Sequence, residues 1–153
     1  MSDFTFNIAL GRVREYASLP AANDALILVL LQSTGLQTDA TLRDHDNLSV
    51  LLAASNDEAT FTGYVRKTVS SGITITVDDT NDWLDIDMAD QVWALAGGAV
   101  NNTIAKLLIC YDPDIGAGTD TTIVPLAAHD INFTTDGSDA TVQFQVGGFW
   151  RAA

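Results

Sequence analysis

In several stretches of this chain, apolar residues occupy every second position, which is the period of a half-buried β-strand. FTFNIAL predicts one such strand, whose apolar face would hold Phe4, Phe6, Ile8 and Leu10. The run ALILVLL, residues 25–31, is apolar on both faces and predicts a central strand. NTIAKLLICY predicts another largely buried strand, and TTIVPLAAHDI predicts one in which Pro125 would suit a sheet edge or a bulge.

Turn residues between alternating stretches predict two hairpins. In YVRKTVSSGITITV, Ser71-Gly72 would form the turn, and the apolar positions of the two arms are Val65, Val69, Ile73, Ile75 and Val77. In INFTTDGSDATVQFQV, Asp136-Gly137 would form the turn, and the apolar positions are Ile131, Phe133, Val142, Phe144 and Val146. The last strand of this hairpin would end at Val146.

DATLRDHDNLSVLLAAS is the only fair helix candidate in the chain. Thr38 or Asp39 could cap its start, and Leu48, Leu51 and Leu52 could form a narrow apolar stripe. One short helix beside many strands predicts a mainly β fold, either a β-sandwich or a barrel-like domain. The chain has 153 residues, with no linker and no long internal repeat, so we expect one domain over residues 1–153.

The net charge of −13 argues against nucleic acid as a partner, because an acidic surface repels phosphate. The composition, 47% hydrophobic, is too apolar for a disordered chain. The longest aliphatic run, residues 25–31, is far shorter than the roughly twenty residues that a membrane-spanning helix needs. The segment MSDFTFNIALGR lacks the basic region, apolar core and cleavage site of a signal peptide. We therefore expect no nucleic acid partner, no membrane span and no Sec export.

The stretch VDDTNDWLDIDMAD, residues 77–90, holds six aspartates. On a strand, its alternation would turn three side chains inward, Leu84, Ile86 and Met88, and two outward, Asp85 and Asp87. We interpret it as a solvated strand face, with cation binding and acid–base chemistry as alternatives. An EF-hand loop would need a glycine at its sixth position and a glutamate at its twelfth, and no frame through these aspartates supplies them.

A better cation candidate is DPDIGAGTD, in which Asp112, Asp114 and Asp120 stand around Gly116 and Gly118. Glycine lets the backbone curl so that oxygen ligands can converge, and such ligands suit calcium. However, Gly116 occupies a position where Asp or Asn would be expected, and any long turn between strands uses the same residue types. A calcium loop and an ordinary turn both remain open at this point.

Nucleophilic catalysis has few candidates in this chain, which contains two histidines and one cysteine. His45 lies between two aspartates in RDHDN, an arrangement that charged surface turns commonly produce. Cys110 lies in the apolar LLICYD without a basic neighbour, so we expect it to be buried and inert. We therefore expect a protein that is not an enzyme and has no catalytic, cofactor-binding or metal-binding residues.

Five segments cover most of the chain: FNIALGRVREYASLPAANDALILVLL, DATLRDHDNLSVLLAASNDEATFTGYVRKT, VDDTNDWLDIDMADQVW, LLICYDPDIGAGTDTTIVPL and HDINFTTDGSDATVQF. Together they resemble small structural proteins encoded among the virion genes of tailed bacteriophages, often labelled minor head or capsid-associated proteins. The resemblance implies a capsid decoration or cement protein, made in the host cytoplasm and oligomeric in the virion, whose partners are the major capsid protein or other virion proteins. The alternatives are a tail or head–tail component of the virion and a calcium-assisted carbohydrate-binding or adhesive β-sandwich module.

The last stretch, VGGFWRAA, places Phe149 and Trp150 after two glycines. Two large aromatic side chains are expected to be buried, because their apolar area is too large to stay exposed to water. They could cover an open end of their own sandwich, or they could dock with Arg151 on a neighbouring subunit or the capsid lattice.

Overall fold

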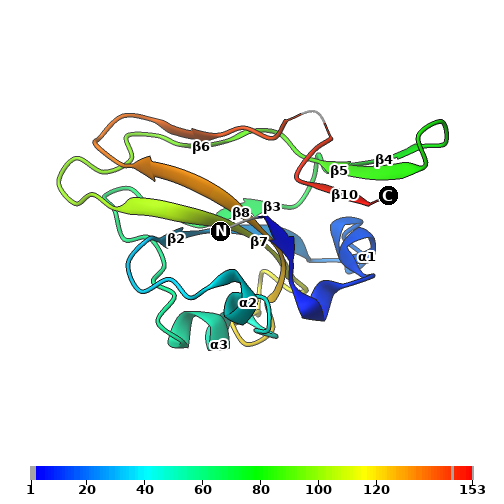
Figure 1. The fold of residues 1–153 in the computed structure, drawn as a ribbon, viewed down its shortest axis with the longest axis horizontal. Coiled ribbons are helices and arrows are strands. Elements are labelled where there is room, and N and C mark those ends of the chain that lie inside the picture. The colour runs from blue at the N-terminus through cyan, green and yellow to red at the C-terminus, as the bar shows by residue number, and fades with distance from the viewer. Residues whose placement is uncertain (1–2, 146, 153) are drawn as a thin grey trace.

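The computed structural model describes residues 3–145 and 147–152, and this part of the chain is mainly β, as expected (Figure 1). The described residues form three antiparallel sheets with the strand orders β1-β8-β7-β2-β3, β10-β5-β4 and β6-β9. The large sheet consists of β1 (Phe4–Thr5), β2 (Ala25–Gln32), β3 (Lys67–Val69), β7 (Thr103–Asp112) and β8 (Val124–Thr134). The smaller sheets consist of β4 (Thr74–Asp78), β5 (Trp83–Asp87), β10 (Trp150–Ala152), β6 (Gln91–Trp93) and β9 (Ala140–Val142).

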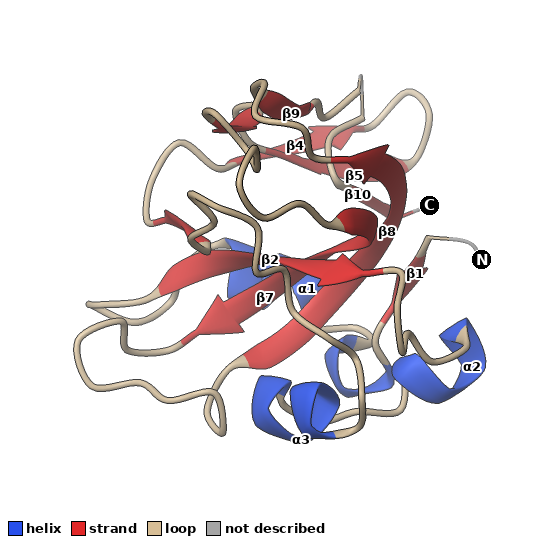
Figure 2. Ribbon diagram, turned by 90° about the vertical axis from the view of Figure 1, so that its left-hand side faces the viewer, coloured by secondary structure: helices blue, strands red, loops and turns tan. Residues whose placement is uncertain are grey.

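The large sheet lies between two layers (Figures 1 and 2). The two small sheets cover one face, and helices α2 (Asp39–Leu42) and α3 (Leu48–Ala53) cover the other. A 3₁₀ helix (Asn7–Ala9) and α1 (Val13–Ala17) follow β1. Among the described residues, no helix is long and apolar enough to cross a membrane.

Strand β2 is buried on both faces, which confirms the prediction of a central strand. Leu26, Leu28 and Leu30 belong to the core beneath the small sheets, which we call the sandwich core. Ile27, Val29 and Leu31 belong to the core beneath α2 and α3. Because successive side chains of a strand point to opposite faces, a strand covered on both sides needs apolar residues at every position.

The predicted strand in FTFNIAL is wrong beyond Thr5. The amide of Phe6 donates to the carbonyl of Leu126, but the next amide, of Asn7, donates to Arg43, so the chain leaves β8 there. The 3₁₀ helix then turns the apolar side chains apart. Phe6 is fully buried, whereas Leu10 is 63% exposed.

The predicted helix over residues 39–55 is interrupted. Asn47 ends the break by capping α3, because its Oδ1 accepts a hydrogen bond of 3.0 Å from the amide of Val50. Leu48 and Leu51 are buried as expected, but the apolar contacts of α2 come from Leu42. Asparagine is a strong N-cap residue, so the RDHDN segment divides one apolar pattern into two short helices.

Both predicted hairpins are wrong in their strand pairing. β3 pairs with β2, and β4 pairs with β5, so Ser71-Gly72 lies in a connection between two sheets. Similarly, Asp136-Gly137 forms a turn, but β8 pairs with β7 and β1 whereas β9 pairs with β6. The predicted end at Val146 lies outside the described residues. In the first predicted hairpin, the apolar positions Val69, Ile73 and Ile75 contact the sandwich core, whereas Val65 and Val77 are 63% and 59% exposed. Alternation carries no information on which strand lies beside another.

Pro125 lies at a bulge, which was one of its two predicted places. The register between β7 and β8 shifts where Ile109 faces Ala127 and Cys110 faces Pro125, so Leu126 is an extra residue in β8. A bulge tolerates proline because it already interrupts the ladder of backbone hydrogen bonds.

Candidate functional site

An open groove separates β8 from the chain that follows β9, and we call it the β8–β9 groove. Its main hollow, of about 660 Å³, is lined on one side by residues 129–131 and on the other by residues 142–145 and 147–150. A second hollow, of about 380 Å³, is lined by the adjoining residues 132–136 and 138–141. The sequence predicts a hairpin in INFTTDGSDATVQFQV, but its two arms, which contain the end of β8 and β9, belong to opposite layers. The groove lies between these two arms.

One wall of this groove is the edge of β8, and the other begins at the edge of β9 and continues along the segment that follows it. β1 pairs with β8 only at Ala127 and Ala128, so no strand in the described part of the chain lies beside the outer edge of residues 129–134. β9 likewise pairs only with β6 among those residues. The Asp3 carboxylate takes the place of a neighbouring strand at one amide of β8, because it accepts from the Asp130 amide at 2.7 Å. On the side that faces β6, Asp90 accepts from the Phe144 amide at 3.0 Å.

The floor of the groove is apolar and belongs to the sandwich core. It includes residues from both walls and from the end of the chain: Ile131, Phe133, Val142, Phe144, Phe149 and Trp150. Phe144 and Phe149 are in edge contact, with 6.1 Å between ring centroids. The indole of Trp150 donates to the hydroxyl of Thr5 at 3.0 Å.

This geometry answers the question raised by VGGFWRAA in favour of the chain's own core. Phe149 is buried, and β10 pairs with β5. Arg151 lies on the outer face of this pair, where it makes two hydrogen bonds to Asp85 of 2.5 and 2.8 Å and stacks over Trp83 at 3.9 Å. The chain end thus supports one wall of the groove.

The rim of the groove is acidic. Asp3, Asp130 and Arg151 line the main hollow, and Asp136 and Asp139 line the second one. His129 contacts Asp3 at 3.1 Å through Nδ1, while its Nε2 is buried without a hydrogen-bond partner in the described residues. Hydrogen bonds from the Ser138 side chain and amide lower the pKa of Asp136, so this carboxylate is ionised at neutral pH.

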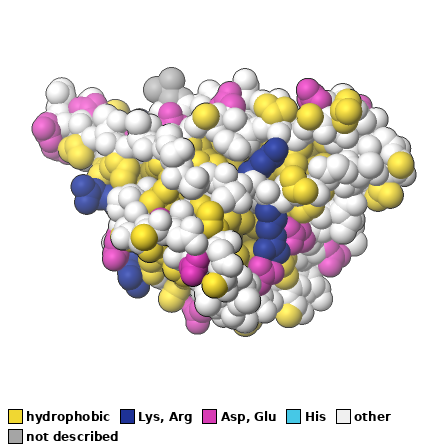
Figure 3. All heavy atoms as spheres, turned by 180° about the vertical axis from the view of Figure 1, so that it is seen from behind, with side chains coloured by type: hydrophobic (Ala, Val, Ile, Leu, Met, Phe, Trp, Pro, Cys, Tyr) yellow, Lys and Arg dark blue, Asp and Glu magenta, His cyan; other side chains and the backbone are white. Residues whose placement is uncertain are grey.

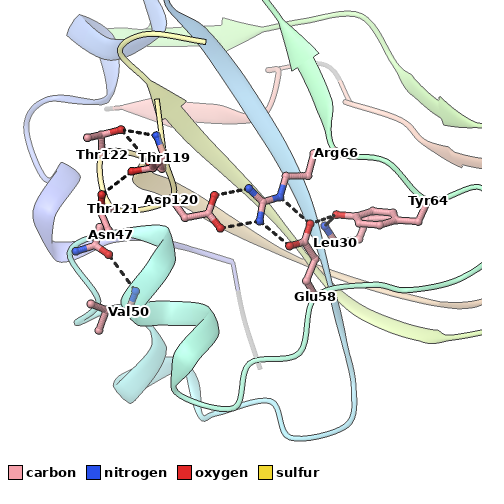
Figure 4. A network of polar contacts seen from close by, with 10 residues as sticks. All are labelled: Leu30, Asn47, Val50, Glu58, Tyr64, Arg66, Thr119, Asp120, Thr121 and Thr122. Carbon is pink, nitrogen blue, oxygen red and sulfur yellow. Dashed lines mark hydrogen bonds and ion pairs between the residues drawn. The ribbon is translucent and has the colours of Figure 1, made fainter. Parts of the chain in front are cut away.

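Asp120, one of the candidate calcium ligands, binds Arg66 (Figure 4). Arg66 bridges Asp120 and Glu58, with hydrogen bonds of 2.5 and 3.0 Å to Asp120 and two of 2.7 Å to Glu58. Tyr64 adds a hydrogen bond to Glu58 at 2.8 Å and accepts one from the amide of Leu30. Hydrogen bonding from Arg66 lowers the pKa of Asp120. This network joins β2, the start of β3 and the loop before β8, so its role is structural.

The other two carboxylates of DPDIGAGTD shape their own loop. Asp112 accepts from the amide of Asp114 at 3.1 Å, and Asp114 accepts from Asn23 at 2.6 Å and from the amide of Gly116 at 3.0 Å. Within residues 3–145 and 147–152, no three His, Cys, Asp or Glu side chains are grouped to hold a metal ion. The three aspartates are therefore not grouped as a metal site: Asp112 and Asp114 make the hydrogen bonds of a turn, and Asp120 forms an ion pair with Arg66.

The aspartates of residues 77–90 act individually. The β4–β5 hairpin projects from the body of the protein in Figure 1, and acidic side chains gather at its end in Figure 3. Ile86 and Met88 are buried, as the alternation predicts, whereas Asp85 and Asp87 are half-buried rather than fully solvated. Asp85 binds Arg151, which lowers its pKa, and Asp87 accepts from the amide of Met88.

His45 and Cys110 both have structural surroundings. The Nε2 of His45 lies 2.7 Å from the side-chain oxygen of Gln37, which also accepts from Asn56. Cys110 is fully buried, and this burial raises the pKa of its thiol. A thiol with a raised pKa is a poor nucleophile at neutral pH.

Lys106 was missed at the level of sequence. It lies in β7 with its side chain fully buried, and its Nζ lies 3.0 Å from Asp39 of α2 and also pairs with Asp130 of β8. The ring of Phe4 lies 5.2 Å from the same ammonium group. The lone lysine within TIAKLLICY was the available signal, because a charge in a buried strand requires carboxylates nearby.

Comparison with protein-family models, with curated protein sequences and with solved structures finds no significant match to this chain.

Proposed function

We propose that this chain is a non-enzymatic structural protein of a tailed-bacteriophage virion, a decoration or cement protein that docks on the major capsid protein. The observation that carries the proposal is the β8–β9 groove, in which an apolar floor lies between the open edge of β8 and the wall formed by β9 and the segment after it. Such a groove offers backbone hydrogen bonds and apolar contacts to another protein chain. The resemblance of the whole sequence to virion structural proteins supports the setting.

The charged side chains form ion pairs that connect elements of the fold, and this supports a role without catalysis. Arg66 holds Glu58 and Asp120, and Lys106 holds Asp39 and Asp130, so these groups connect elements of the fold. In an active site, by contrast, charged groups converge on a shared cleft with shifted pKa values. The groove offers binding surface, and its histidine and carboxylates are engaged with each other and with backbone amides.

A tail or head–tail position is the alternative within the virion, because docking through the same groove would serve there equally well. The calcium-assisted carbohydrate-binding alternative receives less support, since the aspartates of its candidate loop bind Arg66, Asn23 and backbone amides.

Copy number in purified particles tests the proposal. We expect quantitative mass spectrometry of virions to find this chain at a stoichiometry near that of the major capsid protein, and we expect it to assemble there as a homo-oligomer. A far lower copy number would assign it to the tail or the head–tail junction. Absence from particles would overturn the virion proposal altogether.

A further inference from the structure

We infer that the β8–β9 groove binds an extended, basic segment of a partner protein, which adds as a strand to the open edge of β8. The partner segment has apolar residues at every second position and Lys or Arg between them. This inference deepens the proposed function and rests on it for the identity of the partner as a virion protein, whereas the mode of binding follows from the groove itself.

The backbone of β8 provides the first part of the argument. Beyond Ala128 its outer edge has no neighbouring strand among the described residues, and one of its amides is held by the Asp3 side chain instead. That side chain is 61% exposed, so the carbonyl of an incoming strand can replace it at little cost. The edge over residues 129–134 is long enough to pair with a strand of ordinary length, which rises about 3.3 Å per residue.

The side chains of the groove provide the second part. Ile131 and Phe133 on one wall, and Val142 and Phe144 on the other, are spaced two residues apart and contact the sandwich core. An extended segment that lies between these walls turns every second side chain toward this floor. Apolar residues at those positions gain burial, whereas polar ones would lose hydration without finding partners.

Charge selects the occupant. Four carboxylates (Asp3, Asp130, Asp136 and Asp139) and one guanidinium (Arg151) line the two hollows. Asp130 is paired with Lys106 and Arg151 with Asp85, so the excess negative charge of the rim comes from Asp3, Asp136 and Asp139, on a chain with a net charge of −13. A second copy of the chain would bring the same charge to the same rim and would be repelled. A segment with Lys or Arg at its outward positions is attracted to the carboxylates of Asp3, Asp136 and Asp139, and this attraction weakens as salt increases.

The probe is a fluorescein-labelled peptide of about nine residues that alternates Val and Lys, long enough to span the described β8 edge. Fluorescence anisotropy with the isolated full chain measures its affinity. We expect binding at least about tenfold tighter than for a peptide that alternates Val and Glu, and than for one with the same Val and Lys residues in two separate blocks. Hydrogen exchange in the complex should show new protection over residues 129–134.

The double variant Gln143→Lys/Gln145→Lys places two positive charges on the groove wall at exposed positions. The matched control, Ser70→Lys/Ser71→Lys, adds the same charge at exposed positions between β3 and β4. We expect the groove variant to bind the Val–Lys peptide at least about fivefold more weakly than the control variant, with both folded as judged by circular dichroism.

Three results would overturn the inference: equal binding of the block peptide, equal loss in the two double variants, or binding without protection of β8. Protection of β8 that arises from self-association, without peptide, would assign the groove to a second copy and would also overturn it. None of these results depends on whether the chain occurs in virions, so failure of the binding mode is distinguishable from failure of the proposed function.

Discussion

Replacing Lys106 by Met removes the ammonium group that Asp39 and Asp130 face, while it keeps the length of the side chain. The Lys106 side chain is 0% exposed, and those of Asp39 and Asp130 are 16% and 32% exposed. Breaking a fully buried ion pair costs about 3–5 kcal/mol, because one charge remains without its counterion. Water reaches both carboxylates here, so we expect the free energy of unfolding to fall by about 2–4 kcal/mol.

Urea unfolding monitored by tryptophan fluorescence measures this loss. For a chain of this size, 1 kcal/mol corresponds to roughly 2–4 °C in the melting temperature, so Lys106→Met should melt about 5–15 °C lower. Neutralising the carboxylates as well, in Lys106→Met/Asp39→Asn/Asp130→Asn, should recover most of the loss. Well-packed neutral groups often replace a buried ion pair at no net cost.

The comparison between the single and triple variants decides whether the loss is electrostatic. The reasoning requires non-additive effects, since the three side chains form one cluster. It would be refuted if Lys106→Met were as stable as the unmodified chain, or if the triple variant were as unstable as Lys106→Met alone. The latter result would mean that Lys106 acts through packing.

Three further predictions follow from the carboxylates and from one glycine. Hydrogen bonds from Arg66 place the pKa of Asp120 in the folded state below its pKa in the unfolded state. The ion pair therefore stabilises the fold above the unfolded pKa, and this stability is lost as pH falls through the folded pKa. Asp120→Asn should lower the melting temperature at pH 7, and below about pH 4 its melting temperature should decrease less steeply than that of the unmodified chain. At Gly148 φ is +70°, and a Cβ would lie 2.0 Å from a β5 carbonyl oxygen; at Gly72 φ is +76°, and no atom lies within 4 Å of the position of a Cβ. Gly72→Ala should lower the free energy of unfolding by roughly 1–2 kcal/mol, and Gly148→Ala by several times as much, as measured by urea unfolding. Chelation with EDTA should leave the melting temperature unchanged, and a fall that calcium reverses would contradict the assignment of the candidate calcium loop to a turn.

The sequence predicts the strands of this fold better than their partners. β2, β7 and β8 could be located because short aliphatic runs bounded by turn residues favour buried strands, and β5 because its inward residues alternate with aspartates. The pairing of β3 with β2 could not be predicted, since it depends on contacts between segments about forty residues apart in the chain. Turn residues such as Ser71-Gly72 occur in hairpins and in connections between two sheets, so they do not indicate which of the two is formed.

The polar clusters were less predictable than the strands for a related reason. Asp120 and Arg66 are 54 residues apart, and nothing near Asp120 in the sequence indicates its partner. The glycine-rich surroundings of Asp112 and Asp114 suit a cation loop and a turn equally well, so local composition could not separate the two. Only the fold, which brings Arg66 to Asp120, assigns this carboxylate to an ion pair.

The β8–β9 groove lies in the segment that the sequence predicts as the hairpin INFTTDGSDATVQFQV. The buried faces of its two arms were predicted correctly, but the pairing of the arms with each other was wrong. Ile131 and Phe133 on one arm, and Val142 and Phe144 on the other, all contact the sandwich core. Had the arms paired with each other, their backbone groups would have satisfied one another and the core would have been closed along this side. Because β8 lies in the large sheet and β9 pairs with β6 in the opposite layer, both arms keep an open edge and the core is reached from between them. An edge of this kind either promotes unwanted association or binds a particular partner, and the inferred basic strand is the partner whose charge suits the carboxylates along its rim.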